Sequence, residues 1–102
     1  MTIKIGINGM GRIGRMVLRS IIESKNKNII IKHINNRTNS EITTNLLKND
    51  SIHGKLNANI SFNKKNLVIN KKKVTFSQYL NIEEINWKKL GVDYVFECTG
   101  KF

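Results

Sequence analysis

Cysteine is nearly absent from this sequence, and long apolar runs are absent altogether. The single cysteine, Cys98, excludes an internal disulfide framework and favours a reducing, cytoplasmic compartment. No apolar run approaches the roughly 20 residues of a membrane-spanning helix, so no membrane partner is expected. Residues 1–6 lack the cationic and apolar regions of a signal peptide. The 102 residues contain no repeat and no proline, and their number allows one small domain.

Acidic residues are also few, because seven Asp and Glu stand against 18 Lys and Arg and leave a net charge of +11. Such a charge can indicate nucleic-acid binding, since lysine and arginine neutralise phosphates. The basic residues are spread along the chain, however, and Lys, Asn and Ile are enriched together, which indicates a compositional bias at the surface. A solvated basic surface is therefore the favoured interpretation, and a basic nucleic-acid-binding module is the alternative.

The hydrophobic pattern predicts alternating strands and helices, the order that is typical of an α/β fold. The predicted strands cover residues 2–8, 29–35 and 92–98, the last two of them buried. Helices are expected from the glycines near residue 10 to Ser24, over 41–48 and over 82–90. A β-hairpin is expected to join residues 66–70 to residues 73–77 through a turn at Lys71-Lys72.

All three helices have an apolar face that can be named from the sequence, and in the helix over 82–90 it consists of Ile82, Ile85 and Leu90. In the first helix, apolar residues recur at helical spacing and predict one inward stripe: Ile13, Val17, Leu18, Ile21 and Ile22. The shorter helix over 41–48 is expected to begin at a cap, Asn39 or Ser40, and to turn three residues inward: Ile42, Leu46 and Leu47.

The clearest functional pattern is Gly9-Met10-Gly11-Arg12-Ile13-Gly14, which lies between a predicted strand and a predicted helix. In that context, G-x-G-x-x-G is a fingerprint of dinucleotide binding. Gly9 permits the tight turn, Gly11 lets a pyrophosphate approach the backbone, and Gly14 lets the helix pack closely on the strand. The helix N-terminus and Arg12 then favour the anion. The alternative is a glycine-rich turn without a ligand.

A second signal lies where the second strand ends, at the position that reads the adenosine ribose in such folds. Asn36 occupies this position. An acid would accept hydrogen bonds from both ribose hydroxyls and repel a 2′-phosphate, whereas a carboxamide carries no charge. Arg37 follows directly and can pair with a 2′-phosphate. We therefore predict weak discrimination between NAD and NADP, or a tilt toward NADP; the alternative is a plain turn with Arg37 in solvent.

Thr99 and Gly100 follow the last predicted strand. Ligands in open α/β sheets bind outside the carboxyl ends of the strands. These two residues are therefore candidate neighbours of the cofactor, and an ordinary strand-end turn is the alternative.

Three blocks of the sequence closely resemble phosphorylating glyceraldehyde-3-phosphate dehydrogenase and occur in that family's order. They are residues 4–15 (KIGINGMGRIGR), residues 46–48 with 50–55 (LLK and DSIHGK), and residues 91–102 (GVDYVFECTGKF). Erythrose-4-phosphate dehydrogenase shares the pattern and is the closest rival. The resemblance implies a homotetrameric enzyme of glycolysis that oxidises an aldehyde through a thioester and transfers hydride to NAD.

The resemblance also assigns cofactor contacts to matching positions. It implies Arg12 and Ile13 at the pyrophosphate, Asn36 at the adenosine ribose, and Thr99 and Gly100 along the cofactor. With the glycine motif, the expected cofactor-binding residues are Asn8, Gly9, Gly11, Arg12, Ile13, Gly14, Asn36, Arg37, Thr99 and Gly100.

Three departures from the family pattern bear on the cofactor. The family usually has Asp where Asn36 stands, and it commonly has Phe where Met10 stands. It also has an Arg, in an acidic stretch with a proline, that contacts the adenine end of the cofactor. The matching residues 76–82 contain neither, so that contact is lost or is replaced by Gln78 or Tyr79.

No catalytic residue is expected in this chain, because the family's nucleophilic Cys and activating His would lie beyond residue 102. Cys98 is expected to be a buried structural thiol, and His53 to have a structural role. No Cys and His cluster has metal-ligand spacing. We therefore expect residues 1–102 to form a partial Rossmann unit, a doubly wound parallel sheet with an inserted β-hairpin, without the catalytic domain. A non-functional remnant is the further alternative.

Overall fold

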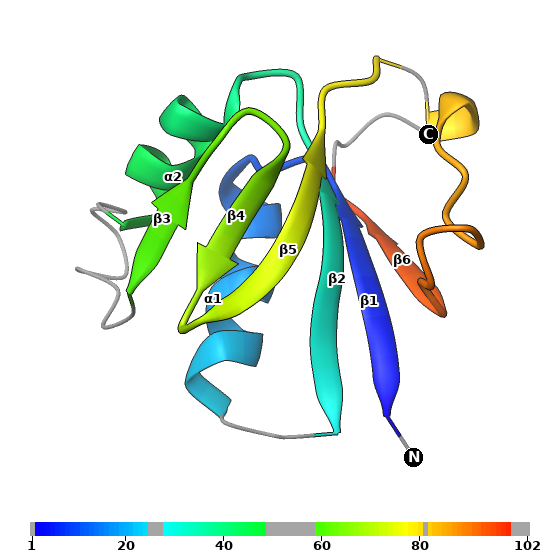
Figure 1. The fold of residues 1–102 in the computed structure, drawn as a ribbon, viewed down its shortest axis with the longest axis horizontal. Coiled ribbons are helices and arrows are strands. Elements are labelled where there is room, and N and C mark those ends of the chain that lie inside the picture. The colour runs from blue at the N-terminus through cyan, green and yellow to red at the C-terminus, as the bar shows by residue number, and fades with distance from the viewer. Residues whose placement is uncertain (1, 25–27, 49–58, 81, 99–102) are drawn as a thin grey trace.

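Six strands form one sheet, and two helices lie against one of its faces (Figure 1). The computed structural model describes residues 2–24, 28–48, 59–80 and 82–98. The elements in chain order are β1 (Ile3–Asn8), α1 (Arg12–Ser24), β2 (Ile29–Asn35), α2 (Ser40–Lys48), β3 (Ile60–Phe62), β4 (Asn66–Ile69), β5 (Lys72–Ser77), the 3-10 helix η1 (Ile82–Glu84) and β6 (Tyr94–Glu97). No helix in these ranges has the length and apolar character that a membrane span requires.

The sheet has the order β3-β4-β5-β2-β1-β6. Strands β5, β2, β1 and β6 run parallel, whereas β3, β4 and β5 pair antiparallel. The predicted α/β fold with a parallel sheet and an inserted hairpin is thereby confirmed. Strand β3 was not predicted, because three residues are too few to show an alternating pattern.

The turn of the hairpin is one residue earlier than predicted. Ile69 pairs with Lys72, so Asn70 and Lys71 are the two central residues, with φ values of 49° and 71°. A two-residue turn with positive φ at both positions has the twist that suits a hairpin. Asn accepts this conformation readily, but the Cβ of Lys71 makes it costly.

The core lies between the sheet and the helices. Its buried apolar residues come from both helices, the glycine turn and every strand except β6: Ile5, Ile7, Met10, Leu18, Ile34, Leu47, Ile60, Leu67, Ile69, Val74 and Phe76. In α1, Leu18 is fully buried and Val17, Ile21 and Ile22 pack against the core, as predicted. Ile13 was wrongly placed in this stripe, since it is 57% exposed at the first turn of α1.

The inward face of α2 also differs from the prediction. Ile42 and Leu46 are 47% and 43% exposed, whereas Thr43, Thr44 and Leu47 are buried. Hydrogen bonds decide this orientation, because the buried Ser40 hydroxyl donates to the carbonyl of Asn63 at 2.6 Å. Asn39 is the cap, since its Oδ1 accepts the N–H of Ile42 at 2.9 Å.

The predicted helix over 82–90 is wrong: the structure has only η1, followed by turns that end at Gly91. Asn86 interrupts the helix because its Oδ1 accepts the N–H of Lys89 at 3.1 Å and so starts a new turn. This path lays the Trp87 ring against Gly6 in β1, where a Cβ would collide with the ring.

The last strand is shorter and more exposed than predicted for residues 92–98. Strand β6 lies at the edge of the sheet, pairs only with β1 in the described part of the chain, and leaves Tyr94 62% exposed. An apolar run is expected in a buried strand, but the sequence does not reveal which strand lies at an edge.

Candidate functional site

The carboxyl ends of four parallel strands form one row of polar residues. Asn8 lies opposite Asn35 and opposite Glu97, and Asn35 lies opposite Ser77. The loops that follow β1, β2 and β5 therefore start side by side, at the upper end of the sheet in Figure 1. A crevice outside such strand ends is where open α/β sheets bind ligands.

The glycine turn between β1 and α1 is built for close packing on one side and for access on the other. Gly9 has a φ of 96°, and its N–H donates to the carbonyl of Asn35 at 2.8 Å. A Cβ on Gly14 would collide with the carbonyl oxygen of Gly9, whereas a Cβ on Gly11 would meet no described atom within 4 Å. Gly14 thus serves the fold, and Gly11 leaves open space beside the backbone.

The start of α1 is suited to an anion. Its first turn contains no acidic residue, and Arg12 is exposed there. The first N–H groups of a helix have no intrahelical acceptor, and the helix dipole is positive at this end. Arg15 reinforces the turn, since its Nη1 donates to the carbonyl of Met10 at 3.2 Å.

Asn36 ties the loop after β2 to the glycine turn. Its Oδ1 accepts the N–H of Met10 at 3.1 Å, and its Nδ2 donates to the hydroxyls of Thr38 and Thr43 at 2.8 and 3.1 Å. The backbone N–H of Met10 can only donate, so these contacts fix the orientation of the carboxamide. Oδ1 keeps one lone pair, and no carboxylate charge is present at this position.

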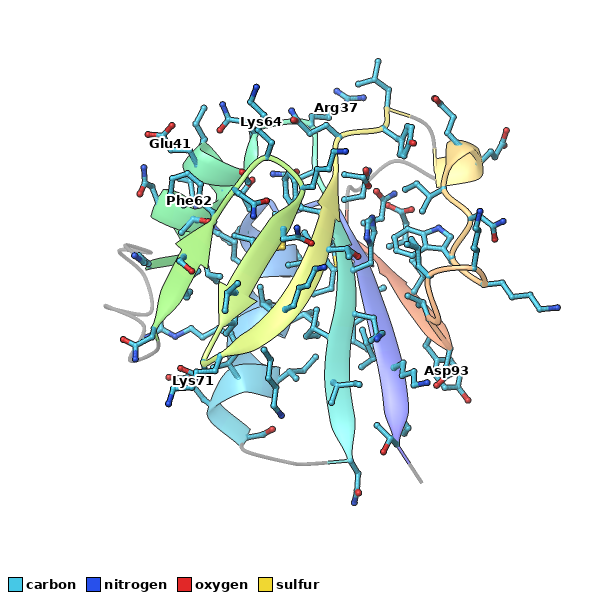
Figure 2. The ribbon with its side chains drawn as sticks, viewed as in Figure 1. Arg37, Glu41, Phe62, Lys64, Lys71 and Asp93 are labelled. Atoms are coloured by element: carbon cyan, nitrogen blue, oxygen red, sulfur yellow. The ribbon has the colours of Figure 1, made fainter. Side chains whose placement is uncertain are left out.

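Arg37 and the segment after β5 border the same end of the sheet. Arg37 is exposed at the upper edge of the molecule (Figure 2), and its carbonyl accepts Nε2 of Gln78 at 3.2 Å. Tyr79 and Leu80, which follow, are 46% and 71% exposed. A cation and two large side chains therefore face solvent beside Asn36.

Side chains connect the polar row across the strands. Asn35, 2% exposed, donates from Nδ2 to Oδ1 of Asn8 at 2.9 Å and accepts the Ser77 hydroxyl on Oδ1 at 2.6 Å. Asn8 in turn donates from Nδ2 to Oε2 of Glu97 at 2.8 Å. Each bond joins strands that are adjacent in the sheet but distant in the sequence, so the row holds the strand ends in register.

His33 extends this row into the sheet. Its Nε2 lies 2.7 Å from the Ser77 hydroxyl, its Nδ1 lies 2.6 Å from the Thr75 hydroxyl, and its ring meets Trp87 edge-on at 5.4 Å. Burial lowers the pKa of His33 from 6.5 to about 4, so the imidazole is neutral at pH 7.

Comparison with known proteins identifies the family. A family model described as "Glyceraldehyde 3-phosphate dehydrogenase, NAD binding domain" matches residues 3–102. The chain belongs to this family.

Individual relatives of the chain carry the same family name. The chain is 43% identical over 102 residues to glyceraldehyde-3-phosphate dehydrogenase of Geobacillus stearothermophilus, 44% identical over 102 residues to that of Priestia megaterium, and 42% identical over 103 residues to that of Ajellomyces capsulatus. In each case all of this chain is covered, but only 30% of the relative.

In this glyceraldehyde 3-phosphate dehydrogenase NAD-binding domain, the structure brings most of the predicted site residues together. Asn8, the three motif glycines, Arg12 and Ile13 surround one turn, and Asn36 is bonded to that turn. Thr99 and Gly100, like His53, lie outside the described residues. Asn35, Ser77 and His33 were missed, although the polar doublet Asn35-Asn36 at the end of an apolar strand was a signal for the first of them.

Cys98 is half-buried and packs beside Gly14, with a free thiol. Burial, and then the charge of Glu97, raise the pKa of this thiol, so it stays protonated and is a poor nucleophile at neutral pH. Cys98 was predicted to be buried, but it is only half-buried and packs against the edge of the core. Among the described residues, no group of three or more His, Cys, Asp and Glu side chains could hold a metal ion.

Proposed function

We propose that this chain binds NAD in the crevice at the carboxyl ends of β1, β2 and β5. One observation carries the proposal: Gly11 lies at the start of α1 with open space where its Cβ would be, while Gly14 closes the turn behind it. The pyrophosphate lies against Gly11 and the N–H groups of Arg12 and Ile13. The family, whose model describes an NAD binding domain, supports this assignment.

The adenosine ribose binds at Asn36, whose Oδ1 accepts one ribose hydroxyl through its remaining lone pair. Because Asn36 brings no negative charge and Arg37 is exposed beside it, a 2′-phosphate is not repelled. The site therefore discriminates weakly between NAD and NADP, or prefers NADP. Tyr79 contacts the adenine ring, to which its half-exposed side chain offers an apolar surface.

Within a longer protein, this domain supplies the cofactor to a phosphorylating glyceraldehyde-3-phosphate dehydrogenase. Three relatives with this name are 42–44% identical to the chain. In that role the domain works in a homotetrameric glycolytic enzyme of the cytoplasm, and Thr99 and Gly100 lie along the cofactor. By the family resemblance, hydride transfer uses a nucleophile and a base outside residues 1–102, and Cys98, a protonated, half-buried thiol, is not that nucleophile.

Calorimetric titration of the folded chain with NAD and with NADP tests the proposal. The decisive variant is Gly11→Ala, whose methyl group meets no described protein atom but would collide with a bound pyrophosphate. We expect an unchanged melting temperature and an affinity for either dinucleotide at least about tenfold lower. Arg12→Ala is the companion variant and weakens binding without adding bulk. A folded chain that binds neither dinucleotide, or a Gly11→Ala variant that binds as well as wild type, would overturn the proposal.

A further inference from the structure

The most completely hydrogen-bonded buried side chain of the row is Asn35. Its Nδ2 donates to Oδ1 of Asn8 and to the carbonyl of Tyr79, both at 2.9 Å. Its Oδ1 accepts the Ser77 hydroxyl at 2.6 Å and the N–H of Tyr79 at 2.9 Å. All four hydrogen-bonding positions of the carboxamide are thus occupied by protein atoms, and the side chain has no capacity left for a ligand.

The Asn35 side chain makes the two hydrogen bonds with the Tyr79 backbone that a neighbouring strand would otherwise make. Strand β5 ends at Ser77, and beyond it both backbone polar groups of Tyr79 bond to the Asn35 side chain instead of to another strand. A peptide-like carboxamide therefore determines where the segment of Gln78, Tyr79 and Leu80 leaves the sheet. This segment also contacts the loop after β2 through Gln78 and the carbonyl of Arg37.

The glycine turn is held differently. Gly9 donates its N–H to the backbone carbonyl of Asn35, and Met10 donates its N–H to Asn36. Neither bond uses the Asn35 side chain. A change in that side chain therefore frees the Tyr79 segment, on the adenosine side of the crevice, and leaves the bonds of the pyrophosphate turn in place.

We infer that Asn35 is a positioning residue for the adenosine half of the cofactor site. It sets the Tyr79 segment at a fixed distance from Asn36, although its own atoms do not touch the ligand. The inference rests on the proposed dinucleotide binding, and it goes further in assigning the adenosine affinity to a buried side chain. Asn8 and Ser77 hydrogen-bond to the Asn35 side chain from the two neighbouring strands, and Glu97 accepts a hydrogen bond from Asn8.

The test compares AMP with inorganic pyrophosphate as calorimetric probes of the two halves of the site. Asn35→Asp preserves the shape but removes both donated hydrogen bonds and places an oxygen against two acceptors, Oδ1 of Asn8 and the carbonyl of Tyr79. We expect the affinity for AMP to fall about tenfold or more and the affinity for pyrophosphate to stay within about twofold. Amide exchange at Tyr79 should become faster, because repulsion between the new oxygen and the Tyr79 carbonyl loosens the segment even though its N–H keeps an acceptor.

Ser77→Ala is the milder variant if Asn35→Asp does not fold. It removes one donor to Asn35 and should weaken AMP binding by about two- to fivefold, again without an effect on pyrophosphate. Ile69→Val, in the core of the hairpin, is the stability control and should change neither affinity in the folded protein. Equal loss of both affinities, or none, in Asn35→Asp or Ser77→Ala would overturn the inference. A folded wild-type chain that binds neither probe would instead refute the proposed function itself, and the inference with it.

Discussion

The carboxamides of Asn8 and Asn35 meet across the β1–β2 pair, with Nδ2 of Asn35 donating to Oδ1 of Asn8 at 2.9 Å. Both side chains are buried, and each residue directly precedes a loop that borders the proposed site. This contact joins the ends of β1 and β2, beside the bond from Gly9 to the Asn35 carbonyl and the bond from Met10 to Asn36. The strand ends beside the two halves of the crevice are thus joined by side chains 27 positions apart in the sequence.

Replacing Gly14 tests the packing side of the glycine turn. Gly14→Ala should destabilise the fold by about 1–3 kcal/mol, because its methyl group collides with backbone that cannot move aside cheaply. Urea denaturation monitored by circular dichroism measures this. Gly11→Ala is the matched control in the same motif and should leave the denaturation midpoint unchanged. If both variants had the same midpoint, the assignment of separate roles to the two glycines would be wrong.

Lys71 offers a stabilising substitution. Its φ of 71° is costly for a residue with a Cβ and free for glycine. Lys71→Gly converts the turn to the preferred Asn-Gly pair and should raise the free energy of unfolding by about 1 kcal/mol. Lys64, an exposed lysine at the other end of the hairpin (Figure 2), provides the charge-matched control Lys64→Gly. A lower stability of Lys71→Gly would show that the turn has another conformation in solution.

Asn36→Asp should shift the cofactor preference toward NAD. The new carboxylate keeps the contact with the N–H of Met10, and its second oxygen can accept from the hydroxyls of Thr38 and Thr43 that now accept from Nδ2. The charge strengthens the bond to a ribose hydroxyl and repels a 2′-phosphate. We expect the ratio of NAD to NADP affinity to rise at least about tenfold. Arg37→Ala should lower the affinity for NADP alone. Unchanged NADP binding by Asn36→Asp would disprove the assignment of the ribose contact to this position.

His33 makes the stability of the domain dependent on pH. Its pKa is lowered by burial to about 4 in the folded chain, against 6.5 in the unfolded chain, so the unfolded state binds the proton more readily. The contribution of His33 is complete above pH 6.5 and is lost as the pH falls toward 4. At about 1.4 kcal/mol for each pKa unit, the free energy of unfolding falls by at most about 3 kcal/mol.

Nuclear magnetic resonance titration of the imidazole measures this pKa directly, and denaturation at several pH values gives the stability. The hydrogen bonds of His33 with Thr75 and Ser77 favour the protonated ring and so oppose the lowering of its pKa by burial. Thr75 also donates to the carbonyl of Lys32, and Ser77 donates to Asn35. Together with the two contacts to the ring, these four hydrogen bonds need four hydrogens. A neutral ring and two hydroxyls supply only three, whereas a protonated ring supplies the fourth. A measured pKa of 6.5 or higher would show that these bonds outweigh burial.

Local patterns account for what the sequence predicted well. The strand–turn–helix unit from β1 to α1 follows from alternation, glycine sterics and helical spacing, all of which act between residues close in the chain. The Asn39 cap and the buried Leu18 follow from the same local rules. The positions of Gly11 and Gly14 in the turn, and of Asn36 one residue past β2, could likewise be stated before the structure was known.

Contacts between distant residues account for the errors. Ile42 and Leu46 have the spacing of an inward face, yet Ser40 and Thr43 turn inward because Asn63 and Asn36 bond to them. The end of η1 depends on Asn86, and the exposure of Tyr94 depends on the place of β6 at the sheet edge. No periodicity contains this information, since these partners belong to other elements.

The sequence by itself determined the α/β order, the glycine turn and the family, because these depend on residue types at fixed short spacings. Only the tertiary structure decided that Glu97, Asn8, Asn35 and Ser77 form one row, and that Asn35 rather than a neighbouring strand holds Tyr79. The physical reason is register. A carboxamide can be fully hydrogen-bonded in a buried position only when the strands bring its partners opposite it, and that alignment is a property of the assembled sheet.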